Sequence, residues 1–524
     1  MQLSPTGHTD TFTRERVLAV DPYPELVDLG YPARLNAGVA LLDDVVARFG
    51  GDRPAVVTDQ MTWSYADLLR RADQIAHVLT VDEGLASGGR VLVRGPNSPD
   101  FIAIVLGVWR AGGVVVASTN RLTARELTPM TDIARIELAL VDHRCPVSLD
   151  RPVQMVTFGD DEWEVRLDKH PGAFTPVDTA ADDVAMIQFT SGTTGQPKGA
   201  LHFHRDVLAM ADVVGGQAIG ITSDDLVTSN RTMGFGYAFG ALIAFPLRHG
   251  AAALVLDDDS PAATFEAVVR HGATVLMTSP PVYRAALAGA AGASLGRLRR
   301  ATSGGEMLPA ATSQAWYDRY GMRLVNLFGT TELTHAILGA VSNDTPHGSV
   351  GRPLPGYEAR VLSEDGRDVP AGEAGELAIL GPTGCRHLDH PRQRTAVREG
   401  WTCTGDVVHM DTDGNVWVHG RSDDLVSVDG WLVAPAEVEE VMLEYPGVGE
   451  AVVTGVPLPD GGSRLHAFLT GAPDLAGLDA HLRANVARCK VPEVIEVLDA
   501  MPRTTIGKVD RMGLRDRAAQ AAAG

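Results

Sequence analysis

The sequence predicts an α/β protein in which a large N-terminal domain of parallel-sheet βα layers carries a small antiparallel subdomain and precedes a mobile α+β C-terminal domain. Two changes of pattern along the chain support this prediction. Short β-branched runs alternate with longer helical stretches between residues 55 and 300, and glycine-punctuated short strands take over beyond residue 350. Alternating strands and helices are typical of parallel sheets that helices cover on both faces.

Repeated strand–helix–strand units account for the N-terminal part. Residues 89–94 (GRVLVR) predict a strand, residues 98–100 (SPD) predict the start of a helix that continues through Trp109, and residues 113–117 (GVVVA) predict the next strand. The pattern recurs where a strand predicted at 273–277 precedes a helix around Pro281.

Short strands and tight turns distinguish the segment that follows. Runs at 356–362, 375–380 and 415–419 are separated by turns at 364–366 (EDG) and 411–414 (DTDG). This alternation predicts an antiparallel meander.

A separate C-terminal unit is predicted from residue 423, so that the domains comprise residues 1–422 and 423–524. We expect a helix that begins near Pro435 and strands at 451–456 and 465–469. The alanine-rich end of the chain, residues 518–524, is expected to be a frayed tail.

Charge and cysteine usage exclude several classes of function. The 524 residues include 45 basic and 66 acidic side chains, and the formal net charge is −21. Such a chain lacks the basic field on which binding to phosphate backbones and anionic membranes depends, so neither a nucleic acid nor a membrane is an expected partner. No apolar run approaches the ~20 residues of a spanning helix, and no secretory signal is visible. The four scattered cysteines form no Cys-x-x-Cys pair, as expected of reduced thiols in the cytoplasm.

Lysine is rare in this chain. Of the 45 basic residues only four are lysines, namely Lys169, Lys198, Lys490 and Lys508. Lysine carries a compact charge on a flexible stem, which can follow a phosphate or carboxylate oxygen through a reaction. Lys198 and Lys508 lie in glycine-bearing loops and are therefore the first candidates for catalysis.

The loop at residues 190–199 (TSGTTGQPKG) directly follows a strand predicted at 184–189. Glycines and small hydroxyl side chains let backbone N–H groups and Ser/Thr oxygens surround anionic oxygens, and Lys198 adds a positive charge. The spacing does not fit GxxxxGK[ST], which excludes a P-loop nucleotide triphosphatase. We therefore predict a phosphate-binding loop that includes Thr190, Ser191, Gly192, Thr193, Thr194 and Gly195.

A second glycine-bearing loop, at residues 502–511 (PRTTIGKVDR), carries Lys508 near the end of the C-terminal unit. A lysine in a domain that is joined by a single chain crossing can be brought to a distant site and withdrawn. This placement predicts a mechanism in which the small domain swings.

Taken together, the motifs resemble those of the adenylate-forming superfamily, which includes acyl- and aryl-CoA ligases, adenylation domains of peptide synthetases and luciferases. The resemblance runs from about residue 35 to 516, with motifs in family order at 190–199, 303–309 (SGGEMLP), 328–332 (FGTTE), 401–406 (WTCTGD), 420–424 (GRSDD) and the Lys508 loop. The stretches 34–43, 198–206 and 381–386 are most similar to benzoate and 2-aminobenzoate CoA ligases.

This resemblance implies a role for each matching residue. Gly304, Gly305 and Glu306 would line an adenine pocket, while Asp406 and Arg421 would hold the ribose hydroxyls. Thr331 would contact the α-phosphate, Glu332 would bind Mg²⁺, and Asp423 would be the hinge. Elementary chemistry agrees, because a carboxylate suits a hard cation that bridges phosphates and an aspartate accepts hydrogen bonds from two vicinal hydroxyls.

The implied activity is that of an ATP- and Mg²⁺-dependent carboxylic acid:CoA ligase, with ATP, Mg²⁺ and coenzyme A as cofactors and an aromatic or bulky cyclic acid as the expected substrate. The acid would attack ATP to form acyl-AMP, with Lys508 between the carboxylate and the α-phosphate. The small domain would then pivot so that the thiol of CoA attacks the mixed anhydride. A homodimer is compatible with the sequence.

Aromatic residues and histidines are candidates for the acyl pocket. The run 233–240 (MGFGYAFG) interleaves aromatics with glycines before a helix, and by analogy Phe235 and Tyr237 would contact the acid, aided by His202 and His335. Aromatics beside a helix start are also common in protein cores, and single histidines commonly have structural roles, so both interpretations stay open.

Two alternatives to a CoA ligase also remain. One is a stand-alone adenylation enzyme that loads a carrier-protein thiol, and the other is a nucleotide- or acyl-AMP-binding relative that has lost one half-reaction or all turnover. Many relatives have a lysine shortly after the hinge, whereas this chain has residues 427–430 (SVDG), so that lysine's contribution to thioester formation is absent here.

Overall fold

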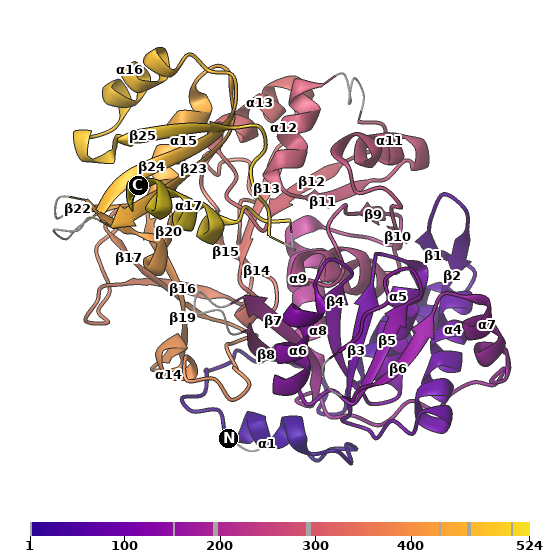
Figure 1. Ribbon diagram of the computed structural model, residues 1–524. Coiled ribbons are helices and arrows are strands. Elements are labelled where there is room, and N and C mark those ends of the chain that lie inside the picture. The colour runs from indigo at the N-terminus through magenta and orange to yellow at the C-terminus, as the bar shows by residue number, and fades with distance from the viewer. Residues whose placement is uncertain are drawn as a thin grey trace.

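The computed structural model describes residues 3–149, 152–191, 197–289, 295–428, 431–457, 463–504 and 507–523. Figure 1 shows a large part built on two mainly parallel sheets, an adjoining antiparallel sheet and a smaller C-terminal part. The α/β class predicted from the sequence is confirmed. Within the described residues, no helix combines the length and apolar character required to cross a membrane.

The first sheet has the strand order β6-β5-β3-β4-β7-β8. Its strands are β3 (Arg90–Gly95), β4 (Val114–Thr119), β5 (Leu138–Asp142), β6 (Gln154–Phe158), β7 (Val184–Ser191) and β8 (Pro197–Phe203). Neighbouring strands are parallel except β7 and β8, which form an antiparallel pair.

The second sheet has the order β15-β14-β13-β12-β11-β9-β10-β1-β2. Its strands are β1 (Pro54–Val57), β2 (Thr62–Ser64), β9 (Leu226–Thr228), β10 (Ala252–Leu254), β11 (Val275–Thr278), β12 (Arg300–Gly304), β13 (Leu324–Gly329), β14 (Ala336–Gly339) and β15 (Arg352–Pro353). The strands from β13 to β1 are parallel, so their carboxyl ends share one edge of the sheet.

A buried helix lies between the two sheets. Helix α5 (Pro99–Arg110) begins where the hydroxyl of Ser98 accepts a hydrogen bond from the N–H of Phe101 at 3.2 Å, and it is buried from Phe101 to Arg110. Its side chains share one core with α4 (Tyr65–His77) and with strands of both sheets. A helix that is apolar on all sides is stable only in such a sandwiched position.

Further helices cover the large part (Figure 1). They are α1 (Phe12–Leu18), α2 (Ala37–Leu41), α3 (Asp43–Phe49), α6 (Ala124–Ile133), α7 (Asp161–Asp168), α8 (His204–Met210), α9 (Gly236–Phe239), α10 (Phe245–Arg248), α11 (Pro261–His271), α12 (Pro280–Ala288), α13 (Ala310–Tyr320) and α14 (Gln393–Ala396).

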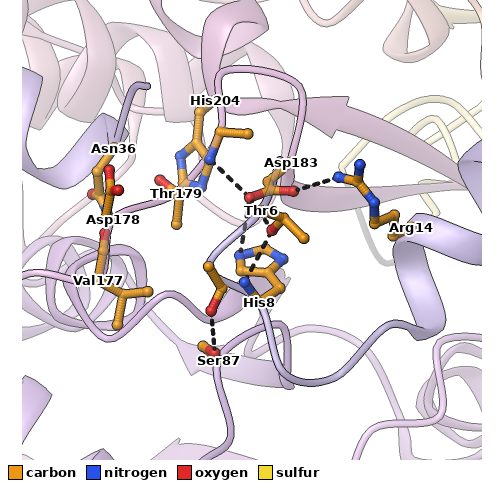
Figure 2. A network of polar contacts seen from close by, with 12 residues as sticks. Thr6, His8, Arg14, Asn36, Ser87, Val177, Asp178, Thr179, Asp183 and His204 are labelled. Carbon is orange, nitrogen blue, oxygen red and sulfur yellow. Dashed lines mark hydrogen bonds and ion pairs between the residues drawn. The ribbon is translucent and has the colours of Figure 1, made fainter. Parts of the chain in front are cut away.

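The N-terminal arm is tied to the strand that leads into the predicted phosphate loop (Figure 2). The carboxylate of Asp183, which is buried, accepts a hydrogen bond from the hydroxyl of Thr6 at 2.6 Å and lies 3.3 Å from Nη1 of Arg14. The N–H of Ala180 donates to the same carboxylate at 2.8 Å. Because a buried carboxylate is stable only when it is paired and hydrogen-bonded, Asp183 fixes the arm next to the start of β7.

The predicted meander is an antiparallel sheet with the order β16-β17-β19-β18, in which β20 also pairs with β19. Its strands are β16 (Glu358–Leu362), β17 (Ala374–Leu380), β18 (Val397–Arg398), β19 (Trp401–Met410) and β20 (Val416–Arg421).

The C-terminal part has its own sheets and core. It contains β21 (Val426–Val428), β22 (Trp431–Val433), α15 (Pro435–Glu444), β23 (Val448–Pro457), β24 (Ser463–Gly471), α16 (Leu475–Asn485), β25 (Val494–Leu498) and α17 (Arg511–Ala523). Strand β24 pairs antiparallel with β23 and parallel with β25. The predicted helix near Pro435 and both predicted strands are confirmed.

The expectation of a frayed tail is wrong. Helix α17 continues to Ala523 and buries Leu514 and Ala518 against Val452 and Phe468 of the neighbouring strands. Small apolar side chains suffice for this packing because the sheet supplies the large ones, and the alanine-rich sequence favours the helix.

Candidate active site

The carboxyl ends of β12 and β13 bring two predicted motifs to one edge of the nine-stranded sheet. Ser303 pairs with Asn326 and Gly304 with Leu327, so the chain leaves both strands side by side. The short 3₁₀ helix η4 (Thr331–Leu333) follows β13 and carries Thr331 and Glu332. Ligands of open α/β sheets bind at carboxyl edges of this kind.

The end of β12 and the residues that follow it have the features of a ligand site. A Cβ on Gly304 would lie 2.4 Å from Cε2 of Tyr237, and Gly305 has a φ of +81°, so both positions suit glycine. The hydroxyl of Ser303 and Oε1 of Glu306 are buried without a hydrogen-bond partner among the described residues. Because buried polar atoms normally have partners, these atoms fit a site that binds a polar ligand.

Asp406 and Arg421 face each other across β19 and β20. Their Cα positions are in register, and Nη1 of Arg421 lies 3.2 Å from Oδ2 of Asp406. Arg421 also donates a hydrogen bond to the carbonyl of Thr404 at 2.8 Å. Burial raises the pKa of the Asp406 carboxyl, and the positive charge of Arg421 opposes this shift. The pair is therefore held in place and can accept and donate hydrogen bonds to ligand hydroxyls.

Glu332 lies beside a second polar cluster. Nε2 of His387 is 3.6 Å from Oε1 of Glu332. Burial by itself would raise the pKa of the Glu332 carboxyl, but His387, with a contribution from Arg421, outweighs burial and lowers the pKa to about 2. The carboxylate is thus ionised at neutral pH and offers hard oxygen donors.

The donor set fits Mg²⁺ that arrives with a nucleotide. Within the described ranges, no group of three or more His, Cys, Asp or Glu side chains is arranged to hold a metal ion. Mg²⁺ commonly binds through one or two protein carboxylates, and substrate phosphates and water complete its coordination. An ionised Glu332 fits that mode of binding.

The lysine loop of the C-terminal part reaches the same sheet edge. Gly507 has a φ of +79°, and a Cβ on it would lie 3.4 Å from Nη1 of Arg121 in the large part. Lys508 is an exposed residue, and its ammonium group interacts electrostatically with Arg231, Glu306, Asp406 and Arg421. Partial loss of hydration lowers the pKa of the Lys508 ammonium, and Arg231 lowers it further while Glu306 raises it.

Polar contacts connect α15 with the large part. Nδ1 of His419 lies 3.2 Å from Oε1 of Glu437, and the N–H of Ala310 donates to Oε1 of Glu440 at 3.2 Å. Asp423 lies between β20 and β21, in the short 3₁₀ helix η5 (Ser422–Asp424). Polar contacts are typical of interfaces between domains that move relative to each other.

The predicted phosphate-binding loop is described only in part. Thr190 pairs with Lys198 across β7 and β8, and the Lys198 side chain interacts electrostatically with His390. Only the backbone of Ser191 is described, and the predicted residues Gly192, Thr193, Thr194 and Gly195 lie outside the described residues.

Two of the predicted pocket residues pack against each other next to Gly304. The rings of Tyr237 and His335 are stacked with centroids 5.4 Å apart, and the Tyr237 hydroxyl is 2.7 Å from Oγ1 of Thr302. Burial lowers the pKa of His335 to about 4, so its ring is neutral at physiological pH. Phe235, which is half-buried, immediately precedes α9.

His202 lies on β8 and contacts Thr334 instead of Tyr237. Nδ1 of His202 is 3.0 Å from Oγ1 of Thr334, and burial lowers the pKa of the ring to about 3. Nε2 of His202 and Nδ1 of His335 are both buried without a hydrogen-bond partner among the described side chains and backbone. A neutral imidazole nitrogen of this kind can accept or donate one hydrogen bond to a ligand.

Sequence reasoning missed three residues of this region. Arg231 approaches the Lys508 loop, and Cys385 and His387 lie next to Glu332. Arg231 precedes the aromatic run, and Cys385 belongs to the stretch 381–386. Their roles depend on contacts across the fold, which no local pattern reveals.

The large α/β part has a nucleotide-type site at its sheet edge, and a separate small part places a lysine over that edge. This combination defines an adenylate-forming ligase. The sequence model of the AMP-binding enzyme family matches residues 42–386, and that of the AMP-binding enzyme C-terminal domain matches residues 437–508. The chain therefore belongs to the AMP-binding enzyme family, whose members form acyl-AMP and then acyl-CoA.

Relatives with known names extend over nearly the whole chain. The benzoate–CoA ligase of Thauera aromatica is 31% identical over 507 residues, which cover 92% of this chain and 96% of the relative. The fatty acid–[acyl-carrier-protein] ligase ScoC of Streptomyces coeruleorubidus is 31% identical over 488 residues, which cover 88% and 93%. Among solved structures, the anthranilate CoA ligase AuaEII in complex with anthranoyl-AMP matches with a TM-score of 0.87 at 26% identity and covers 94% of this chain and 99% of its own. The resemblance to adenylate-forming enzymes predicted from the motifs is confirmed.

Proposed function

We propose that this protein is an ATP- and Mg²⁺-dependent ligase that joins an aromatic or bulky cyclic carboxylic acid to coenzyme A in the cytoplasm. The observation that carries the proposal is the position of Lys508, which crosses from the C-terminal part to the surroundings of Glu306, Asp406 and Arg421. Similarity to a benzoate–CoA ligase and to an anthranilate CoA ligase supports both the class of acid and the thiol.

The sheet edge would bind the nucleotide. Gly304, Gly305 and Glu306 would contact the adenine, and Asp406 with Arg421 would hold the ribose hydroxyls. The segment from Thr190 to residue 195, together with Lys198, would surround the β- and γ-phosphates. Glu332 would hold Mg²⁺, which neutralises phosphate charge when bound.

In the first half-reaction, a carboxylate oxygen of the acid attacks the α-phosphorus of ATP, and the bond from that phosphorus to the pyrophosphate oxygen breaks. Both reactants are anionic, so the principal task of the protein is to offset charge and align them. Lys508 would lie between the carboxylate and the α-phosphate, and the hydroxyl of Thr331 would donate to the α-phosphate.

The acyl pocket would be formed by Phe235, Tyr237 and His335, with His202 behind Thr334. Burial keeps the pKa of His335 near 4 and that of His202 near 3, so neither ring is charged at neutral pH. A neutral, aromatic-lined wall favours an apolar ring system over a second carboxylate.

In the second half-reaction, the C-terminal part would rotate about Asp423 and withdraw Lys508. The thiol would lose its proton to solvent as its sulfur forms a bond to the acyl carbon, and the bond between that carbon and the phosphate oxygen would break to release AMP. The polar character of the contacts named above between α15 and the large part supports such a rotation.

The direct test is product analysis. Purified protein is incubated with ATP, Mg²⁺, coenzyme A and a panel of benzoate, anthranilate, medium-chain and polycyclic acids, and mass spectrometry detects acyl-CoA. We expect an aromatic acid to give the most product. No carboxylate-dependent pyrophosphate exchange with any acid would instead favour a relative that has lost turnover.

Similarity to the carrier-protein ligase ScoC favours one alternative, in which the acceptor is the thiol of a holo acyl-carrier protein. The same reactions with a holo carrier in place of coenzyme A distinguish the two acceptors. Light scattering of the purified protein tests the homodimer.

A further inference from the structure

A buried cysteine and histidine lie behind Glu332, in a segment to which the proposed reaction assigns no role. Cys385 is fully buried and His387 is 3% exposed. Their segment is fixed on both sides, because the N–H of His387 donates to Oε1 of Gln393 at 2.9 Å and the N–H of Leu388 donates to the carbonyl of Gly199 at 2.8 Å. The imidazole therefore has a defined place in the fold.

The ring of His387 lies between Cys385 and Glu332. Nδ1 is 3.4 Å from Sγ of Cys385, and Sγ is also 3.8 Å from Nε2, which is 3.6 Å from Oε1 of Glu332. Burial raises the pKa of the Cys385 thiol, so the sulfur carries its proton. The similar distances from Sγ to both nitrogens place the thiol against the ring, and a proton on Nε2 can be donated toward the Glu332 carboxylate.

The arrangement excludes a nucleophilic role for Cys385 and favours a supporting one. A nucleophilic cysteine needs a thiolate and access to its substrate, whereas this thiol is protonated and enclosed. The same small pocket is lined by Thr330, Glu332, Cys385, His387, Arg392 and Thr404. Glu332 thus shares one small pocket with the buried pair.

We propose that His387 is a positioning residue that holds Oε1 of Glu332 through its Nε2–H, so that the carboxylate is presented to Mg²⁺, and that Cys385, whose sulfur lies against the ring, keeps the imidazole in place. The inference rests on the proposed function, since it takes Glu332 as the metal-binding carboxylate. The 3.6 Å separation exceeds a direct hydrogen bond, and rotation about the last side-chain torsion of Glu332 can shorten it. Partners of this kind commonly alter metal affinity by 10- to 100-fold when removed.

The test compares His387→Leu, which removes the donor, with His387→Gln, whose amide nitrogen can replace Nε2. The matched control is His271→Leu, because His271 also pairs with a carboxylate, its Nε2 lying 2.5 Å from Oδ1 of Asp59, on the far helix α11. Calorimetry measures the binding of ATP with excess EDTA and at a series of Mg²⁺ concentrations, so that no acid substrate is needed.

We expect His387→Leu to raise the Mg²⁺ concentration required for half-maximal enhancement of ATP binding by roughly 10- to 100-fold, with ATP binding in EDTA unchanged within about twofold. His387→Gln should recover most of this loss, Cys385→Ala should cause a smaller loss of roughly two- to fivefold, and His271→Leu should match the wild type.

An unchanged Mg²⁺ requirement in folded His387→Leu protein would overturn the inference, and so would an equal loss of ATP binding with and without Mg²⁺. If His387→Leu does not fold, His387→Asn replaces it, because the shorter amide cannot reach Glu332. Equal Mg²⁺ requirements of the Asn and Gln variants would then overturn the inference. Wild-type protein that binds no ATP would refute the proposed function as well, whereas normal wild-type binding with an unaffected variant refutes the inference alone.

Discussion

The two sides of the candidate site are held in different ways. On the large part, Gly304 and Glu332 follow central strands, and the groups around them are buried and packed. On the C-terminal part, Lys508 is accessible to solvent on a loop, and that part has a core of its own. A lysine that is carried by a separate core can be delivered and withdrawn without disturbing the nucleotide side, which two successive half-reactions require.

The largest expected effect comes from Lys508→Ala. Adenylation, measured as carboxylate-dependent pyrophosphate exchange, should fall by roughly 10²- to 10³-fold because one charge-stabilising donor is lost. Conversion of added acyl-AMP to acyl-CoA should change much less, since Lys508 has been withdrawn by then.

Lys169→Ala is the control for this substitution, because Lys169 is an exposed lysine at the end of α7. Equal losses in both half-reactions would contradict the proposed difference between the two sides of the site.

The next effect concerns the ribose side. Asp406→Asn removes a buried carboxylate paired with Arg421, and hydrogen bonds to charged groups are worth about 1.5–3 kcal/mol. The KM for ATP in the adenylation half-reaction should therefore rise by roughly 10- to 100-fold.

Asp368→Asn provides the matched control in the same antiparallel sheet. Asp368 pairs with Arg360, whose Nε is 2.7 Å from Oδ1 of Asp368, but this pair is exposed. An unchanged KM for ATP in Asp406→Asn protein would contradict the assignment of Asp406 to the nucleotide site.

A smaller effect is expected from Gly304→Ala. The new Cβ would lie 2.4 Å from Cε2 of Tyr237, so the ring must shift within a packed pocket. Overpacking of this kind costs about 1–3 kcal/mol, and a loss in the lower part of this range, about 1.4 kcal/mol, weakens binding of acid or nucleotide roughly tenfold.

Gly172→Ala is the comparison, because a Cβ there meets nothing within 4 Å. Adding Tyr237→Leu to Gly304→Ala should recover part of the lost binding, and its failure to do so would argue against the steric explanation.

The smallest effect concerns the contact between the two parts. His419 lowers the pKa of Glu437 to about 2, with Lys490 assisting and burial opposing. A folded-state pKa below the usual ~4.3 means that the stabilising contribution is present at neutral pH and is lost as the pH falls through about 2. Because the pair is partly exposed, its contribution to the free energy of unfolding is less than about 1 kcal/mol.

Scanning calorimetry of Glu437→Gln protein checks this prediction. The difference from wild type should be small at pH 7 and should shrink as the pH falls from about 4.3 toward 2. Glu493→Gln, which alters an exposed glutamate within the C-terminal part, serves as the control. A difference that grows on acidification would contradict the assigned sign.

Much of the fold could be predicted because patterns within short stretches of the sequence indicate its helices and strands. Ser98 and Pro99 mark the start of α5, and the runs at 451–456 and 465–469 became β23 and β24. The end of the chain could not be predicted in this way. Its alanines carry little hydrophobic signal, and their burial depends on Val452 and Phe468, which lie far away in the sequence.

The candidate site shows the same division. Residues within ordered motifs, such as Glu332 and Asp406, could be assigned because each motif is a contiguous string. The partners of those residues could not, since 54 residues separate Glu332 from His387 in the chain and Arg231 approaches the Lys508 loop from the other part. The spacing of such contacts is set by sheet order, which local periodicity does not encode.

By itself, the order of residues determined the α/β class, the two-part organisation and the chemical types available at the site, because helix starts, turns and short motifs depend on neighbours in the chain. The tertiary structure decided which of these groups meet. Only the packing of sheets shows that a histidine and a thiol lie behind Glu332, and that Lys508 lies over the nucleotide edge, since distances between remote segments arise from burial of the shared core.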